Sequence, residues 1–326
     1  MSKLKVAVLY GGRSGEHEIS IQSAESIMKA MDGSKYEIEP IFISKEGHWK
    51  PRTISPDPSA NTNIDVVFPV LHGTFGEDGT IQGLLELADL PYVGAGVLGS
   101  SVSMDKDITK RLLRERGLPM GEFVSVTRGN WDIDAICAAL PFPMFVKPAN
   151  LGSSVGITKV KRREDLCAAL NQAAQYDRKI IIERGIEGRE LECAVLGNDE
   201  PVAALPCEIL PSREFYDYED KYLLGAARTQ LPADLTPEQT SEIRRLAVEC
   251  YKTVNCEGMA RVDFLLESAT GKLYINEPNT IPGFTAISMF PKMWEAAGLP
   301  YPKLIDRLIQ LALQRHAARK ATRYSR

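Results

Sequence analysis

Apolar residues follow strand-like and then helix-like spacing along the first hundred positions of the chain. The run LKVAVLY at 4–10 has the apolar β-formers of a buried strand, and GGRSGEHE after it has the composition of a turn. ISIQSAESIMKAM then places its apolar residues on one helical face, and YEIEPIFIS has the pattern of a second strand. A further strand, DVVFPVLH, leads through GTFGEDG into the helix TIQGLLELADL. This order predicts a small α/β domain with parallel strands over residues 1–104.

The spacing changes after this first segment. A charged helix, MDKDITKRLLRERGLP, precedes strands at EFVSV, FPMFVKPA and GITKV, a helix near REDLCAALNQA and the strand KIIIERGI. We expect these to form a second domain over 105–187. The strands RELECAVLG, PVAALPCEIL, ARVDFLL and KLYINE, with a helix over about 238–253 and a terminal helix, predict a third domain over 188–326. Its polar and aromatic segment 211–232 is longer than most loops in compact domains, which indicates a lid.

Length and charge support this division and exclude some functions. At 326 residues the chain is longer than one hydrophobic core usually grows. With 25% charged residues and a net charge of −4, it has the composition of an ordinary globular protein and no surface suited to nucleic acid. The basic C-terminal stretch RHAARKATRYSR is interpreted as a solvated, frayed helix end.

The same composition predicts a cytoplasmic protein. The N-terminal run lacks the longer apolar core and small-residue cleavage site of a signal peptide, and no run reaches the roughly 18 apolar residues of a membrane span. The cysteines contain no CxxC pair, which favours reduced core thiols over a disulfide framework or a zinc site. They stand at positions 137, 167, 193, 207, 250 and 256.

One predicted hairpin has the residues of a metal site. RVDFLLESATGKLYINEPN contains two β-rich runs around a turn, and residues two apart share one face of a strand. If the loop has an odd number of residues, Asp263 lies opposite Glu277, and Asn279 lies opposite Arg261 on the same face. Three oxygen donors then converge, which suits Mg²⁺ shared with phosphate. The alternative is a polar face turned to solvent. Against it, we expect the same face to carry apolar residues: Leu265, Leu273 and Ile275.

Other candidate residues lie in loops rich in glycine. FVKPANLGSSVGITKV places Lys147 on a strand before a loop in which Gly152, Ser153 and Gly156 could bring backbone N–H groups to an anion, although an ordinary mobile turn is the default. In YGGRSGEHEIS, Glu16 suits a helix N-terminus through the macrodipole and alternatively could hold an ammonium group. His72 in HGTFGEDGT is either a turn histidine or a group that affects a substrate's protonation.

Taken together, these motifs resemble those of the D-alanine–D-alanine ligases, a family of ATP-grasp enzymes. GGRSGEHEIS, HGTFGEDGT, SMDK, VKPANLGSSVGI, FYDYEDKY, RVDF and NEPNTIPGFT occur in order along nearly the whole chain. The resemblance implies an α/β fold, α+β in part, with three-domain ATP-grasp architecture and an N-terminal parallel-sheet domain. It also implies that the nucleotide lies between the sheets of the central and C-terminal domains.

The resemblance also implies a set of residues that bind nucleotide and metal. Lys106 and Lys147 match lysines that contact ATP phosphates, and Lys221 matches a lid lysine that reaches phosphate. The adenosine site would consist of Glu183 near the adenine amino group, the backbone near Arg184 and Ile186 on the adenine edge, and Glu190 on the ribose hydroxyls. Three residues match the ligands of two Mg²⁺ ions, for which Mn²⁺ could substitute: Asp263, Glu277 and Asn279.

A second set matches the residues that bind the substrates. Glu16 corresponds to the group that holds the first D-alanine's ammonium, and Ser153 and Tyr222 to the partners that hydrogen-bond with it and close the site. Arg261 and the Gly283 backbone N–H correspond to the oxyanion-stabilising pair, and Ser288, with Arg261, to the binders of the second substrate's carboxylate. His72 matches a histidine near the first substrate.

The implied reaction joins two D-alanines for peptidoglycan precursors and cell-wall synthesis. ATP would phosphorylate the carboxylate of the first, and the amine of the second would displace phosphate from the acyl phosphate. Tyr222 favours D-alanine over D-lactate as second substrate, whereas D-serine stays open. Two alternatives stay open. One is another ATP-grasp carboxylate-amine ligase, and the other is a nucleotide-binding regulatory protein that has lost the catalytic activity. The resemblance further suggests a homodimer.

Overall fold

The N-terminal part of the chain forms a parallel sheet. The computed structural model describes residues 3–153, 155–210 and 228–323. Strands β1 and β2 pair in parallel, β1 pairs in parallel with β4, and β3 joins β2 antiparallel. The sheet order is β3–β2–β1–β4, with bounds β1 (Leu4–Gly11), β2 (Tyr36–Ile43), β3 (Trp49–Lys50) and β4 (Val66–Val70). The parallel strands predicted for this segment are confirmed.

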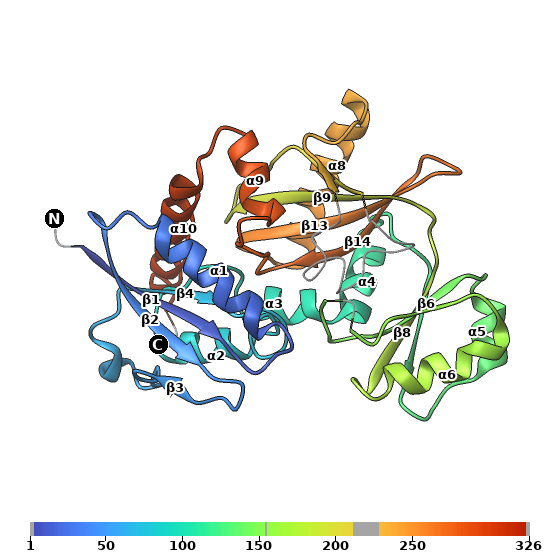
Figure 1. Ribbon diagram of the computed structural model, residues 1–326, viewed down its shortest axis with the longest axis horizontal. Coiled ribbons are helices and arrows are strands. Elements are labelled where there is room, and N and C mark those ends of the chain that lie inside the picture. Colours follow the sequence, from blue (N-terminus) through green and yellow to red (C-terminus); the bar gives the residue numbers. More distant parts are fainter. Residues whose placement is uncertain (1–2, 154, 211–227, 324–326) are drawn as a thin grey trace.

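Helices cover this first sheet because its central strands are apolar on both faces. Val6, Val8 and Leu9 of β1 are fully buried, as expected for a parallel strand with layers above and below. The polypeptide then leads through α3 toward the middle of the molecule (Figure 1). The helical elements of this part are α1 (His17–Ala30), the 3₁₀ helix η1 (Pro58–Asn61), α2 (Thr80–Leu87) and α3 (Val97–Met104).

A second, antiparallel sheet follows, with strand order β5–β8–β6–β7. Its strands are β5 (Phe123–Thr127), β6 (Met144–Pro148), β7 (Thr158–Val160) and β8 (Lys179–Arg184). Helices α5 and α6 pack on it through a core that includes Ile136, Leu170 and Ile182. The helices in this stretch of the chain are α4 (Lys106–Glu115), α5 (Ile133–Ala139) and α6 (Arg163–Ala173), of which α4 packs against α8 and the third sheet through Leu113.

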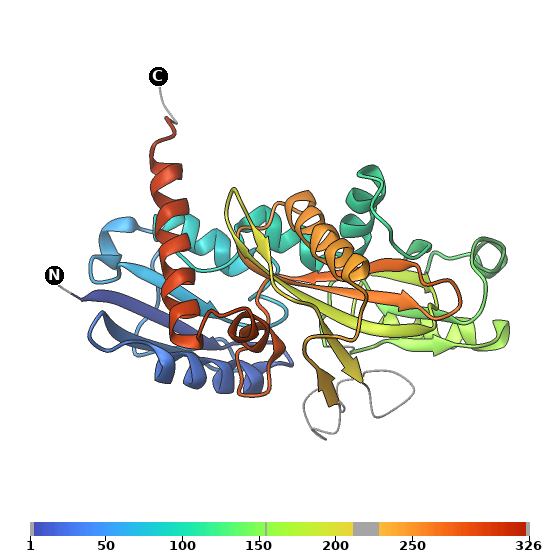
Figure 2. The ribbon, with the colours of Figure 1, turned by 90° about the horizontal axis from the view of Figure 1, so that it is seen from above.

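The third sheet is also antiparallel and lies beside the second (Figures 1 and 2). Its order is β12–β11–β9–β13–β14, and β10 pairs with β9. Its strands are β9 (Gly188–Gly197), β10 (Val202–Ala203), β11 (Cys207–Leu210), β12 (Arg228–Gln230), β13 (Gly258–Glu267) and β14 (Leu273–Asn279). Helix α8 (Pro237–Thr253) covers one face, and its N-terminus has a capping box between Thr236 and Gln239.

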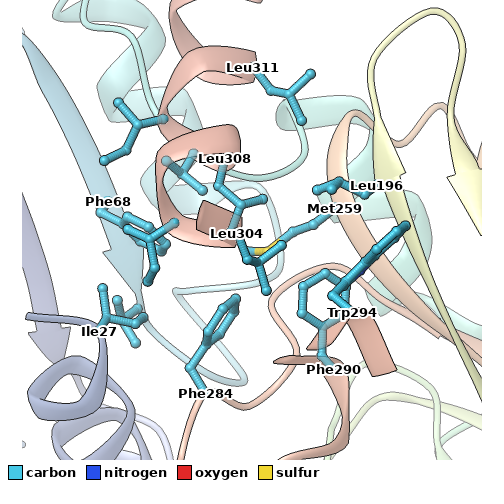
Figure 3. Packing of buried hydrophobic residues seen from close by; sticks show 14 of the residues in the cluster. Ile27, Phe68, Leu196, Met259, Phe284, Phe290, Trp294, Leu304, Leu308 and Leu311 are labelled. Atoms are coloured by element: carbon cyan, nitrogen blue, oxygen red, sulfur yellow. The ribbon is translucent and has the colours of Figure 1, made fainter. Parts of the chain in front are cut away.

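The last two helices join the first and third sheets into one core. Figure 3 shows Phe68 of β4 and Ile27 of α1 on one side, Leu304 and Leu308 of α10 between, and Leu196 of β9 beyond. Helices α9 (Met289–Ala296) and α10 (Tyr301–Lys320) supply the middle layer. The C-terminal helix therefore completes the core of the N-terminal sheet.

The interpretation of the C-terminal stretch as a frayed, solvated helix end is wrong for residues 315–320, which are helical and partly buried, whereas 321–323 are exposed. Arg315 is only 7% exposed, and its guanidinium donates to the backbone oxygens of Gly94 and Tyr92. His316 and Lys320 contact Asp89. The acidic groups at the end of α2 attract these basic residues, so α10 stays helical and docked to Lys320.

Several smaller expectations also need correction. Three short helices, α3, α5 and α9, were not predicted. PVAALPCEIL forms two strands, because β10 and β11 are separate.

All six cysteines are free, but Cys167 is exposed and Cys137 half-buried, so only the other four are core thiols. Of the predicted lid, 211–227 lies outside the described residues, and the rest contains β12. Within the described ranges, no helix is long and apolar enough to cross a membrane.

Candidate active site

The β13–β14 hairpin has the predicted register at its polar end. Asp263 pairs with Glu277, and Arg261 pairs with Asn279. The register then shifts, because Phe264 pairs with Ile275 and leaves Asn276 as an extra residue in β14. The expectation that Ile275 and Leu273 share the face of Glu277 is therefore wrong. The bulge turns both to the opposite face, where Ile275 is buried in the core under α8.

Cations surround the carboxylates of this hairpin. Arg261 donates two hydrogen bonds of 2.7 Å to the oxygens of Asp263, and its Nε lies 3.3 Å from Glu192. Asn279 Nδ2 donates to Asp263 Oδ2 at 2.9 Å. Lys106 Nζ, from the first turn of α4, lies 3.3 Å from Glu277 Oε2. Four elements, β9, β13, β14 and α4, therefore bring acidic and basic groups to one place.

A cavity of about 450 Å³ lies between the second and third sheets, beside this hairpin. It collects predicted nucleotide, metal and substrate residues from β6, β8, β9, β13, β14 and the glycine loop. Those that line it are Lys106, Lys147, Ser153, Glu183, Arg184, Ile186, Glu190, Asp263 and Glu277. Residues separated by more than 170 positions in the sequence thus share one cleft.

At the inner end of the cavity, one carboxylate contacts two lysines. Glu183 Oε2 lies 2.6 Å from Lys147 Nζ, and Oε1 lies 3.0 Å from Lys110 Nζ. Burial raises the pKa of Glu183, but the charges of Lys110 and Lys147 and their hydrogen bonds outweigh it and lower the pKa to about 2. Glu183 is therefore ionised at neutral pH. The sequence analysis missed Lys110, although it stands four residues after Lys106 and so on the same helical face.

The adenosine candidates follow along β8 and into β9. Arg184 lines the cavity, and its guanidinium lies 2.9 Å from Glu267 and 3.0 Å from Glu122. Ile186 lies in the turn between β8 and β9, and Glu190 follows on β9. The cavity is therefore lined by the carboxylate of Glu183, the apolar Ile186 and the carboxylate of Glu190.

The glycine loop after β6 approaches Glu16. Ser153 takes a left-handed backbone conformation, with φ of 54°. A Cβ atom on Gly152 would lie 3.2 Å from Glu16 Oε2, and one on Gly73 would lie 2.8 Å from it. Small residues at both positions therefore let two loops meet at this carboxylate. Glu16 stands at the start of α1 without capping it by a side-chain hydrogen bond.

His72 is buried just after β4 and does not line the cavity between the second and third sheets. Its Nδ1 lies 3.0 Å from the Ile281 carbonyl oxygen, and its Nε2 lies 3.2 Å from Ser23 Oγ. Burial lowers the pKa of His72, but the Glu77 carboxylate, the charge of Glu16 and the Ile281 carbonyl outweigh burial and raise it. His72 thus connects the loop after β4 to the loop that carries Gly283.

That second loop holds the remaining substrate candidates. Ser288 Oγ accepts from the Thr285 backbone N–H at 2.9 Å, and a Cβ atom on Gly283 would lie 2.7 Å from Ser288 Oγ. The backbone of Gly283 and the hydroxyl of Ser288 are therefore neighbours, as an oxyanion donor and a carboxylate binder would need to be. Lys221 and Tyr222 lie outside the described residues.

The oxygen donors of the hairpin fit a hard divalent cation. Asp263 and Glu277 supply carboxylates, and the hydrogen bond from Asn279 uses its amide nitrogen and not its amide oxygen. In the part of the chain that the structure describes, no group of three His, Cys, Asp or Glu side chains is arranged for a metal, so Asn279 would be needed as third ligand. Carboxylates and phosphate oxygens together are the usual Mg²⁺ environment.

Two opposed antiparallel sheets with lysines and acidic oxygens between them are the arrangement of the ATP-grasp enzymes, and the expected fold class is confirmed. Family models described as D-ala D-ala ligase N-terminus and D-ala D-ala ligase C-terminus match residues 5–63 with 51–95, and 112–310. The chain belongs to the D-alanine–D-alanine ligase family.

Relatives and solved structures agree with this assignment. A D-alanine–D-alanine ligase of Solibacter usitatus is 67% identical over 324 residues, covering 99% of this chain and all of the relative. The D-alanine–D-alanine ligase structure from Coxiella burnetii is 40% identical with a TM-score of 0.86, covering 98% of this chain and 97% of that one. The VanG D-Ala:D-Ser ligase structure from Enterococcus faecalis is 37% identical with a TM-score of 0.88, covering 95% and 100%.

Proposed function

We propose that this chain is an ATP-dependent, ADP-forming ligase that joins two D-alanine molecules into D-alanyl-D-alanine for peptidoglycan precursor synthesis. The observation that supports this most is the single cleft that holds both kinds of residue the reaction needs. Lys106 and Lys147 are available for phosphate, and Asp263 and Glu277 for metal, and Gly152 of the cavity wall approaches Glu16. Membership of the family supports the same conclusion.

The cavity wall from β6 to β9 would bind the nucleotide. Glu183 would accept from the adenine amino group, the backbone at Arg184 and Ile186 would face the adenine edge, and Glu190 would bind the ribose hydroxyls. The triphosphate would then extend toward the hairpin, where Lys106 and Lys147 offset its charge. Lys221 belongs to this set by resemblance.

Two Mg²⁺ ions would be held by the oxygen atoms of Asp263, Glu277 and Asn279. Mn²⁺ could substitute for Mg²⁺ there. Bound there, the ions would offset charge on the phosphate oxygens during transfer. The chain's own contribution is to hold the oxygen donors in register on two paired strands. Arg261 and Lys106 balance the carboxylate charges from the other side.

The substrate side would hold the first D-alanine by its ammonium on Glu16, with Ser153, His72 and Tyr222 around it. Its carboxylate would take the γ-phosphoryl group and form an acyl phosphate. The amine of the second D-alanine, held through its carboxylate by Ser288 and Arg261, would attack the acyl carbon. The Gly283 N–H and Arg261 would stabilise the oxyanion, and phosphate would leave.

The first experiment is phosphate release from ATP and Mg²⁺ with D-alanine, L-alanine, D-serine or D-lactate, with the products identified by mass. We expect release with D-alanine alone and the dipeptide as product. A dominant mixed product with D-serine would replace the substrate assignment, and ATP binding without turnover would contradict the ligase proposal. The division at 1–104, 105–187 and 188–326, the homodimer and the cytoplasmic location stay predictions.

A further inference from the structure

We infer that Lys110 is a positioning residue for the nucleotide: it keeps the Glu183 carboxylate paired when Lys147 turns away to contact phosphate. This inference deepens the proposed function, because it rests on a nucleotide in the cleft. Lys110 itself has no part in the predicted site. It is 3% exposed and does not line the cavity between the sheets, whereas Glu183 and Lys147 do.

The geometry divides the Glu183 carboxylate between two cations. One oxygen faces Lys147 at 2.6 Å and the other faces Lys110 at 3.0 Å. All three side chains are at most 12% exposed. Breaking a buried ion pair by removing one partner leaves an uncompensated charge, which is strongly destabilising. Either lysine alone can compensate the charge of Glu183, so Glu183 stays paired when one of the two lysines moves away.

Only one of the two lysines is placed to leave. Lys147 lines the cavity from β6, and Lys106 lines it from α4. Lys110 lies behind the cavity wall on α4, one turn after Lys106, and the Asp105 cap fixes the start of that helix through the Asp107 and Ile108 N–H groups. When phosphate attracts Lys147, Lys110 remains on Glu183. The ionised carboxylate then stays in place to accept from a base amino group.

Without Lys110, nucleotide binding and the pairing of Glu183 would compete for Lys147. Phosphate could take Lys147 only by leaving a buried carboxylate without a cation. The Lys110→Met variant should therefore bind ATP more weakly. If Glu183 is also made neutral, Lys147 has no charge to abandon, so the effect of losing Lys110 should largely disappear. This dependence on Glu183 separates a positioning role from a general effect on folding.

The test is calorimetric titration of ATP with Mg²⁺, without D-alanine, into wild type, Lys110→Met, Glu183→Gln and the double variant. We expect Lys110→Met to weaken binding about tenfold or more when Glu183 is present and no more than about twofold in the Glu183→Gln background. Lys110→Arg should restore most of the affinity. Arg111→Met is the matched control, because Arg111 is the next residue of α4, is exposed and pairs only with Asp107 among the described residues.

An equal loss in both backgrounds, or no loss in Lys110→Met, would overturn the inference. If Lys110→Met does not fold, the double variant and Lys110→Arg still decide, because the double variant contains no unpaired buried carboxylate. Dipeptide formation is measured separately on the wild type. Failure there with intact ATP binding would contradict the proposed function but leave the Lys110 comparison valid.

Discussion

Ser23 Oγ accepts a hydrogen bond from the Phe284 backbone N–H at 3.3 Å and lies 3.2 Å from His72 Nε2. Ser23 is fully buried on α1, so a helix of the first sheet directly positions the loop next to Gly283. This small contact connects the loop of His72 to the loop of Gly283, the two loops of the proposed substrate site.

Replacing Ser23 by alanine should slow ligation more than it weakens ATP binding. The variant leaves the buried Phe284 N–H without its partner, at a cost of about 1–3 kcal/mol, and frees the Gly283 loop to shift. We expect kcat for dipeptide formation to fall about tenfold. Steady-state kinetics and ATP titration measure both quantities. Gln22→Ala, at an exposed position on the same helix, is the control, and an equal effect of both variants would contradict this prediction.

Glu277→Gln should sharply lower ATP-dependent product formation at ordinary Mg²⁺. The change keeps the shape of the side chain but removes the negative charge that suits a divalent cation. The dependence of product formation on Mg²⁺ should move to higher concentration, because the hairpin loses a charged ligand. Product formation is measured across a Mg²⁺ series. Near-normal activity at low Mg²⁺ would refute the metal role of Glu277.

Asp306→Ala should destabilise the docking of α10. Asp306 accepts from the buried Tyr36 hydroxyl at 2.9 Å and from Lys35 Nζ at 2.5 Å. Burial and the nearby Asp306 charge raise the pKa of Tyr36, so its hydroxyl keeps its proton and needs this acceptor. We expect a loss of about 1–3 kcal/mol in the free energy of unfolding, measured in urea.

The exposed Lys303, whose Nζ is 3.8 Å from Asp306, supplies the control for that variant. Lys303→Ala should change the free energy of unfolding by less than about 0.5 kcal/mol. If it costs as much as Asp306→Ala, the Tyr36 contact is not what holds the helix.

Replacing Gly76 or Gly83 by alanine should change the stability of the fold differently. A Cβ atom on Gly76 would collide with the Leu71 backbone carbonyl, whereas one on Gly83, inside α2, meets nothing within 4 Å. Gly76→Ala should cost about 1–3 kcal/mol of stability, and Gly83→Ala should be neutral or stabilise by up to about 1 kcal/mol. Urea unfolding of both variants tests this, and a stable Gly76→Ala would contradict it.

The ion pairs of Glu183 with Lys110 and Lys147 should stabilise the fold in a pH-dependent way. The unfolded chain binds a proton on Glu183 near its ordinary pKa of 4.5, but the native chain binds it only near 2. The stabilisation is therefore complete above pH 4.5 and is lost as the pH falls toward 2. The difference in unfolding free energy between wild type and Glu183→Gln should shrink below pH 4.5. A difference that is constant from pH 7 to 3 would contradict this.

The register of the β13–β14 hairpin could be predicted, because side chains alternate along a strand and the positions of Asp263 and Glu277 satisfy that alternation. The bulge at Asn276 could not, since one extra residue changes no local composition. Ser23 also has no distinctive signal in the sequence, because its partner Phe284 lies far along the chain. Lys110 did have one, the helical spacing from Lys106, and was overlooked.

The C-terminal helix has a consequence for how the protein is made. Leu304 and Leu308 of α10 close the core over Phe68 and Ile27, which are synthesised long before them. While the nascent chain is still on the ribosome, α1 covers part of one apolar face of the first sheet, and the rest stays uncovered until α10 has emerged. A chain without α10 would leave Phe68 and Ile27 without Leu304 and Leu308, so the core between the first and third sheets is completed only after α10 has been synthesised.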